Sequence, residues 1–126
     1  DLEQELAASA SADARAVGLR LGAARRAYND VVQFVLDHAK SQPNAVYAGA
    51  VPYLMLAGNL VAGWQLGRAL LVAEKRLAAG DDPEFMRAKI ATARFYADHM
   101  LSRAAGERDS IVDGHAAVQA ASVDAF

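Results

Sequence analysis

The three histidines of this chain are its best candidates for catalysis or metal binding: His38, His99 and His115. A di-iron site in a helical bundle needs a carboxylate three positions before each histidine, because that spacing puts both ligands on one helix face. Those three positions hold Val35, Tyr96 and Val112. Asp98 directly precedes His99, but adjacent positions on a helix point apart. We therefore predict no metal site and expect the histidines on the surface or in hydrogen bonds.

Nucleophile and cofactor motifs are missing from the sequence as well. No serine lies in a GxSxG context, and the glycines form neither a GxGxxG pattern nor a phosphate-binding loop. The chain has no cysteine, which excludes thiolate catalysis, cysteine zinc sites and disulfides, and which fits a reducing compartment. We predict no catalytic, cofactor-binding or metal-binding residue in this chain, and we expect a cytoplasmic location.

Four residues are the best candidates for contact with a partner: Tyr53, Trp64, Arg68 and Tyr96. Trp64 and Arg68 are four positions apart and share one helix face. Tryptophan and arginine are enriched among the residues that dominate binding energy at interfaces. The alternative is that Trp64 lies in the core and Arg68 pairs with an acidic neighbour. The alternative is favoured, because a single pair of this kind is common.

Apolar spacing predicts that a long first helix, over residues 2–39, presents one stripe to the core. The stripe alternates steps of four and three and consists of Ala10, Ala14, Val17, Leu21, Ala24, Tyr28, Val31 and Val35. The sequence leaves open whether this helix is continuous. A break is predicted at residues 41–44, because Pro43 disfavours helical geometry at Gln42.

A long second helix is predicted over residues 45–79. It is apolar on nearly every side until Arg68, which predicts a helix buried on most faces. Pro52 should kink this helix or mark its start. Gly80 is expected to stop it. Its small residues are expected to pack closely: Gly49, Gly58, Gly63 and Gly67.

The apolar second segment also raises the question of a membrane span, which needs about 20 apolar residues. Polar residues and a proline interrupt the run: Pro52, Asn59, Gln65 and Arg68. We predict a bundle core and no membrane contact, with a membrane-peripheral domain as the weaker alternative. The net charge of −2, from 13 basic and 15 acidic residues, also argues against a nucleic-acid partner.

Two further helices are predicted towards the C-terminus. The third starts with Asp82 as N-cap and Pro83 as its first residue, and fades near residues 105–106. Its apolar row is Met86, Ile90, Ala93, Ala97 and Met100, widened by Phe85 and Phe95, while Arg94 and Asp98 are expected to pair. The shorter fourth helix covers residues 107–120 and turns inward Ile111, Val112, His115 and Val118. The final residue, Phe126, could dock on the bundle or fray.

Composition supports an all-α fold. Hydrophobic residues make up 54% of the 126 positions, alanine is abundant, and runs rich in Val, Ile or Thr are few. Short connections favour antiparallel neighbours, so we predict a single domain over residues 1–126, an up-down bundle of about four helices. The chain begins with Asp1 and its first methionine is Met55, so we expect a piece excised from the C-terminus of a longer enzyme.

Two stretches carry a resemblance to a known family. VPYLMLAGNLVAGWQLGRALL (residues 51–71) and DPEFMRAKIATARFYADHMLSRAAGERDSIVDG (residues 82–114) resemble the extra C-terminal domain of large bacterial acyl-CoA dehydrogenases, in the methylmercaptopropionyl-CoA dehydrogenase-like subfamily. The likeness covers roughly the last two thirds of the chain. FMRAK with IATARFYADH is distinctive as a whole, whereas the alanine-rich first helix matches loosely.

The resemblance implies a parent enzyme of fatty acid metabolism that uses FAD to oxidise the Cα–Cβ bond of an acyl-CoA thioester. In that family, the glutamate base and the main flavin contacts belong to the upstream domains, and nothing here matches that base. The resemblance therefore implies a non-catalytic domain that serves assembly or shapes the substrate entrance. Its expected partners are the upstream domains of the same enzyme, with a homo-oligomer as a further possibility. The alternative is a freestanding interaction or oligomerisation module without enzymatic activity.

Overall fold

The computed structural model describes residues 1–122 and 124, and every regular element in this part of the chain is a helix. The predicted all-α class is thus confirmed. The elements are α1 (Leu2–Ala8), α2 (Ala12–His38), α3 (Pro43–Ala48), α4 (Ala50–Ala78), α5 (Pro83–His99), η1 (Leu101–Arg103), α6 (Ala104–Val112) and α7 (His115–Ala120). The described part therefore holds more and shorter pieces than the predicted four helices. Phe126, predicted to dock or to fray, lies outside the described residues.

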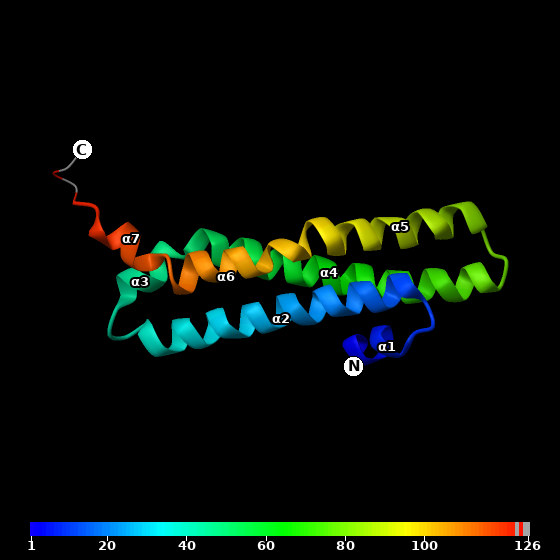
Figure 1. Ribbon diagram of the computed structural model, residues 1–126, viewed down its shortest axis with the longest axis horizontal. Coiled ribbons are helices and arrows are strands. Elements are labelled where there is room, and N and C mark those ends of the chain that lie inside the picture. Colours follow the sequence, from blue (N-terminus) through cyan, green and yellow to red (C-terminus); the bar gives the residue numbers. More distant parts are fainter. Residues whose placement is uncertain (123, 125–126) are drawn as a thin grey trace.

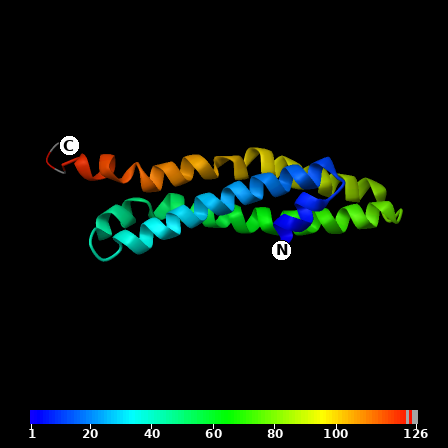
Figure 2. The same cartoon turned by 60° about the horizontal axis from the view of Figure 1, so that its bottom comes forward.

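Three long rods make up the body of the molecule. The chain runs along its length in α2, returns in α4, and reverses again through α5, η1 and α6, while α1 folds back beside α2 and α4 (Figures 1 and 2). The core lies between these rods. Its fully buried side chains include Leu6, Val17, Val31, Leu56, Leu70 and Ile111. Because α1, α2, α4 and α6 all contribute, the core ties the two ends of the sequence together.

The first predicted helix is interrupted at residues 9–11. Ser11 adopts an extended conformation and its hydroxyl accepts a hydrogen bond from the backbone N–H of Ala14 at 3.2 Å, which makes it the N-cap of α2. Serine favours such caps over helix interiors. The break lets α1 turn back, so that Leu6 becomes completely buried, while Ala10 of the predicted stripe is exposed in the connection. The rest of the stripe is buried or half-buried as predicted.

Pro52 marks the start of a helix and does not kink one. The short helix α3 ends at Ala48, Gly49 caps both helices, and α4 begins at Ala50, so Pro52 lies in the first turn of α4. A proline there loses no intrahelical hydrogen bond, because the first N–H groups of a helix have no partner inside it. Gly80 has a φ of 78° just past the end of α4, so the predicted stop at this glycine is confirmed.

The third predicted helix starts where expected but ends early. Asp82, in the left-handed conformation with φ 41°, accepts a hydrogen bond from the backbone N–H of Phe85 at 3.4 Å, and Pro83 follows as the first helical residue. The helix α5 stops at His99, and a 3₁₀ turn leads into α6 before the predicted start of the fourth helix. The predicted pair forms, since Arg94 Nε lies 2.6 Å from Asp98 Oδ2.

Three predictions of inward-facing apolar residues are wrong. Phe85, Phe95 and Val118 are 51%, 61% and 61% exposed, because each lies on the solvent side of its helix. The prediction that α4 is buried on most faces is wrong as well. Only one side of α4 faces the core, and the opposite side is apolar but open to solvent. Each of the three rods packs against the other two and turns its outer side to solvent, so nothing within the described chain covers that side of α4.

The glycines of α4 divide in the same way. A Cβ on Gly63 would lie 2.7 Å from both methyl carbons of Leu101, and one on Gly67 would lie 3.2 Å from Leu6 Cδ1. Both glycines therefore allow close helix packing, as predicted, and so does Gly49 against Ile111. A Cβ on Gly58 would meet no atom within 4 Å, so the prediction of close packing is wrong there.

Candidate interaction surface

The open side of α4 is the most unusual surface of the described chain. Four large apolar side chains lie on it and are more than half exposed; we call them the α4 stripe: Val51, Leu54, Met55 and Val61. Their spacing puts them on one helix face, because positions three, four and seven apart are neighbours along a helix. Gly58 lies among them and adds no side chain, which leaves the stripe flat at its centre. A contiguous exposed apolar surface is typical of an interaction site, whereas single exposed apolar side chains are common on any protein.

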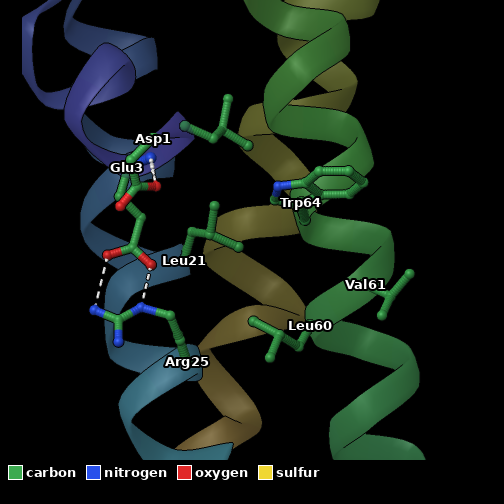
Figure 3. A pocket seen from close by; sticks show the side chains of 8 residues that line it. Asp1, Glu3, Leu21, Arg25, Leu60, Val61 and Trp64 are labelled. Carbon is green, nitrogen blue, oxygen red and sulfur yellow. Dashed lines mark hydrogen bonds and ion pairs between the residues drawn. The ribbon is translucent and has the colours of Figure 1, made fainter.

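A pocket of about 290 Å³ opens next to the α4 stripe, between α1, α2 and α4 (Figure 3). The apolar part of its lining consists of Leu2, Leu21, Leu60, Val61 and Trp64, and the charged part of Asp1, Glu3 and Arg25. Val61 belongs to both the pocket and the α4 stripe. At the mouth, Glu3 of α1 accepts a hydrogen bond from Arg25 Nη2 of α2 at 3.2 Å, and this interaction raises the pKa of Arg25. The ion pair holds α1 in place over one side of the pocket.

Trp64 and Arg68 lie together on the surface of α4. Trp64 is 42% exposed, and the guanidinium carbon of Arg68 lies 4.9 Å from the centre of its ring. This is a cation–π contact. Among the described residues, no carboxylate forms an ion pair with Arg68. The favoured interpretation, with Trp64 in the core and Arg68 paired with an acidic residue, is therefore wrong.

Tyr53 and Tyr96 take part in different contacts and do not join Trp64 and Arg68 in one site. The hydroxyl of Tyr53 lies 3.2 Å from that of Tyr28, and the two rings stack with centroids 5.8 Å apart. The hydroxyl of Tyr96 donates to Asn59 Oδ1 at 3.3 Å, while the amide of Asn59 donates to Glu107 Oε1 at 3.3 Å. Both tyrosines thus link α4 to a neighbouring helix through half-buried polar contacts.

Because of these contacts, the free energy of unfolding depends on pH in the alkaline range. The pKa of Tyr53 is raised above 10.0, first by its hydrogen bond with Tyr28 and then by burial, and that of Tyr96 by burial and by the negative charge of Glu107. The folded state therefore keeps these protons to higher pH than the unfolded state. Their contribution to stability is complete below pH 10 and is lost as the pH rises through the folded pKa values.

We expect the melting temperature to fall as the pH rises from about 10 to about 12, and to fall less steeply when Tyr53→Phe and Tyr96→Phe are combined. Thermal unfolding followed by circular dichroism across this range measures the effect. Tyr47→Phe is the matched control, because Tyr47 is 71% exposed. Parallel pH profiles for the double variant and the unsubstituted chain would contradict the prediction.

The histidines do not form a metal site in the described chain. His38 and His115 both pack against Phe34, with ring centroids 4.3 and 5.3 Å from it, and lie 6.3 Å from each other. His38 Nδ1 lies 2.8 Å from the carbonyl oxygen of Phe34, and His99 stacks on Phe95 at 4.4 Å. Within residues 1–122 and 124, no group of three or more His, Cys, Asp or Glu residues could hold a metal ion. The described helices also include none that is long and apolar enough to span a bilayer.

Sequence reasoning found the pair of Trp64 and Arg68 but missed two features. It placed the α4 stripe in the core, because an apolar segment looks the same whether its own bundle or another chain covers it. It also missed that α2 and α7 bring two histidines together around Phe34. One signal in the sequence could have indicated that the α4 stripe is exposed for a partner: residues 45–67 contain no charged residue.

The fold and the exposed surface define a helical domain without a catalytic constellation among its described residues, and comparison with known proteins places it. The chain belongs to the family described as acetyl-CoA dehydrogenase C-terminal like, whose model matches residues 2–122. It is 45% identical over 111 residues to 3-methylmercaptopropionyl-CoA dehydrogenase of Ruegeria pomeroyi (strain ATCC 700808 / DSM 15171 / DSS-3). That match covers 88% of this chain and 19% of the relative.

A second relative supports the same assignment. The chain is 38% identical over 66 residues to the broad-specificity linear acyl-CoA dehydrogenase FadE5 of Mycobacterium tuberculosis (strain ATCC 25618 / H37Rv), over 50% of this chain and 11% of the relative. The chain thus spans at most about a fifth of the length of these two relatives. No solved structure matches it significantly. The resemblance drawn from residues 51–71 and 82–114 is confirmed at the level of the family.

Proposed function

We propose that this chain is a non-catalytic C-terminal domain of an FAD-dependent acyl-CoA dehydrogenase, and that it docks on the remainder of its own polypeptide through the α4 stripe. The parent enzyme would oxidise the Cα–Cβ bond of an acyl-CoA thioester in its upstream domains. This domain, an up-down helical bundle, would stabilise the assembly or pack beside the substrate entrance. The observation that carries the proposal is the exposed, charge-free apolar face of α4.

The composition of this face fits an interface that is buried in the mature enzyme. The centres of interfaces are depleted of charge and enriched in methionine and aromatic residues. The α4 stripe contains Met55, and Trp64 lies at its border. In a chain with 22% charged residues, an uncharged run over residues 45–67 with one side in water indicates that another surface covers that side.

The accessible surface of the domain points the same way. It amounts to 7731 Å² for a chain of 13.3 kDa. A compact monomer of this mass exposes about 6,400 Å² on the usual scaling. The surplus, about 1,300 Å², belongs to the whole elongated bundle, and it leaves room for the roughly 800 Å² that each partner contributes to a standard interface. The relative from Ruegeria pomeroyi has about four fifths of its length outside the match, which supplies enough further chain to cover this area.

Cysteine labelling tests whether the α4 stripe is covered. The chain has no cysteine of its own, so Leu54→Cys introduces a single thiol into it. We expect a maleimide to react with this thiol about tenfold more slowly in the full-length parent polypeptide than in the 126-residue chain, because docking removes it from water. The matched control is Leu19→Cys on α2, since Leu19 and Leu54 are both 71% exposed in the isolated domain. Its labelling rate should not change.

Other outcomes assign the domain differently. Equal labelling of Leu54→Cys in both proteins would refute docking on the parent chain. If the 126-residue chain dimerises in sedimentation experiments and Leu54→Glu with Val61→Glu abolishes the dimer, the freestanding oligomerisation module is the better assignment. Dye reduction with acyl-CoA by the 126-residue chain alone would refute the non-catalytic role.

A further inference from the structure

A second cleft, separate from the α4 stripe, lies between the C-terminal half of α4 and the first half of α5. It has a volume of about 380 Å³, and three cationic side chains line it: Arg68 and Arg76 from α4 and Lys89 from α5. The apolar part of its wall comes from Val72, Phe85 and Met86. Val72 and Phe85 are 56% and 51% exposed, so the cleft offers both positive charge and open apolar surface.

The charge of this cleft is largely unneutralised. Arg68 lies over Trp64, and the Lys89 ammonium lies 5.1 Å from the centre of the Phe85 ring. An aromatic ring holds a cation in place without cancelling its charge, whereas a carboxylate would cancel it. Among the three cations only Arg76 forms an ion pair within the described chain, with Asp81 Oδ2 2.7 Å from its Nε.

The contrast with other surface hollows of the domain is clear. Each of four other hollows has at least one carboxylate residue in its lining. The pocket beside Trp64 has Asp1 and Glu3, and a hollow between α1 and α2 has Glu3. Of the two hollows beside Ile90, one has Asp13 and the other has Asp13 and Glu74. The cleft between α4 and α5 has none in its lining, although the whole chain carries a net charge of −2. The cations are therefore gathered locally against the overall charge of the chain, which favours an anionic ligand at this place.

We infer that the cleft between α4 and α5 binds a phosphorylated small molecule with an apolar or aromatic group, as found in nucleotides. Guanidinium groups match the oxygen geometry of phosphates, and Lys89 adds a third positive charge. Val72 and Phe85 would pack against the apolar or aromatic group of the ligand. An inorganic ion has no such group and would leave these two side chains in water. The volume lies within the range of about 300–1,000 Å³ that is typical of small-molecule sites. The inference does not depend on docking of the α4 stripe.

Titration of the 126-residue chain with ADP tests the inference, because ADP joins two phosphates to an aromatic ring. By calorimetry or by NMR shifts of the backbone amides around Val72 and Lys89, we expect saturable binding with a Kd below about 1 mM at low salt. Pyrophosphate should compete, and adenosine should bind at least about tenfold more weakly than ADP. Arg68→Gln combined with Lys89→Gln should weaken ADP binding at least about tenfold.

A matched control removes the same charge from the same two helices outside the cleft. Lys75→Gln on α4 with Arg87→Gln on α5 also deletes one lysine and one arginine, and neither residue lines this cleft. ADP binding should stay within about twofold of the unsubstituted chain. Circular dichroism confirms that both double variants remain helical.

Four results would overturn the inference. The first is that ADP shows no saturable binding up to several millimolar, and the second is that adenosine binds as tightly as ADP. The third is that the two double variants weaken ADP binding equally. The fourth is that an oligoglutamate peptide displaces ADP as effectively as pyrophosphate does. The last result would assign the cleft to an acidic protein surface.

Discussion

Leu6→Ala is expected to lower the free energy of unfolding by about 2–5 kcal/mol, the usual range for a leucine truncated in a core. Leu6 is 0% exposed and is the one buried residue of α1. A seven-residue helix is not stable in water by itself, so α1 depends on this side chain for its place in the fold. We expect the lower half of the range, because α1 can detach as a unit and leave the rods paired.

Urea unfolding monitored by circular dichroism measures this loss, and hydrogen exchange shows whether α1 opens first. Gln4→Ala is the matched control, since Gln4 lies on the exposed side of the same helix. It should change stability by less than about 0.5 kcal/mol. A Leu6→Ala variant as stable as the unsubstituted chain would show that α1 contributes nothing to the core.

Gly63→Val should lower the free energy of unfolding by roughly 1–3 kcal/mol, which is the cost of overpacking a core. Its Cβ would lie 2.7 Å from both terminal carbons of Leu101, and Leu101 is only 2% exposed and has little room to move. The η1 turn that carries Leu101 would have to shift away from α4. The rods would then separate at the point where α5 passes into α6.

Gly58→Val separates this packing effect from the general effect of valine in a helix. Both glycines lie inside α4, but a Cβ at Gly58 meets no atom within 4 Å. Valine has a slightly higher helix propensity than glycine, so Gly58→Val should leave the stability unchanged or raise it by a few tenths of a kcal/mol. If thermal melts show equal losses for the two variants, the close contact with Leu101 is not what limits this position.

The sequence predicted helix ends correctly where the preferences of a few neighbouring residues determine them. The cap at Asp82, Pro83 at the start of α5, and the positive φ of Gly80 follow from the conformations that these residue types favour. The sequence leaves the continuity of the first helix open, because serines fit both a surface turn and an N-cap. The reason to fold back is the burial of Leu6 against residues of α2 and α4 that are distant in sequence.

The surface was less predictable than the fold. The spacing of Trp64 and Arg68 showed that they share a face, and the cation–π contact bears this out. The pairing of that face with Lys89 depends on how α5 packs on α4, which no local pattern contains. The same limit explains the wrong expectation for Val51 and Leu54, since hydrophobicity alone does not say which molecule will cover a side chain.

The open side of α4 has a calorimetric consequence for the domain studied by itself. The heat capacity increment of unfolding grows with the apolar area that becomes hydrated only when the chain unfolds. Val51, Leu54, Met55 and Val61 are largely hydrated already, so they add little to it. The stability curve of the isolated domain should therefore be flatter, and its urea dependence shallower, than its number of aliphatic residues suggests.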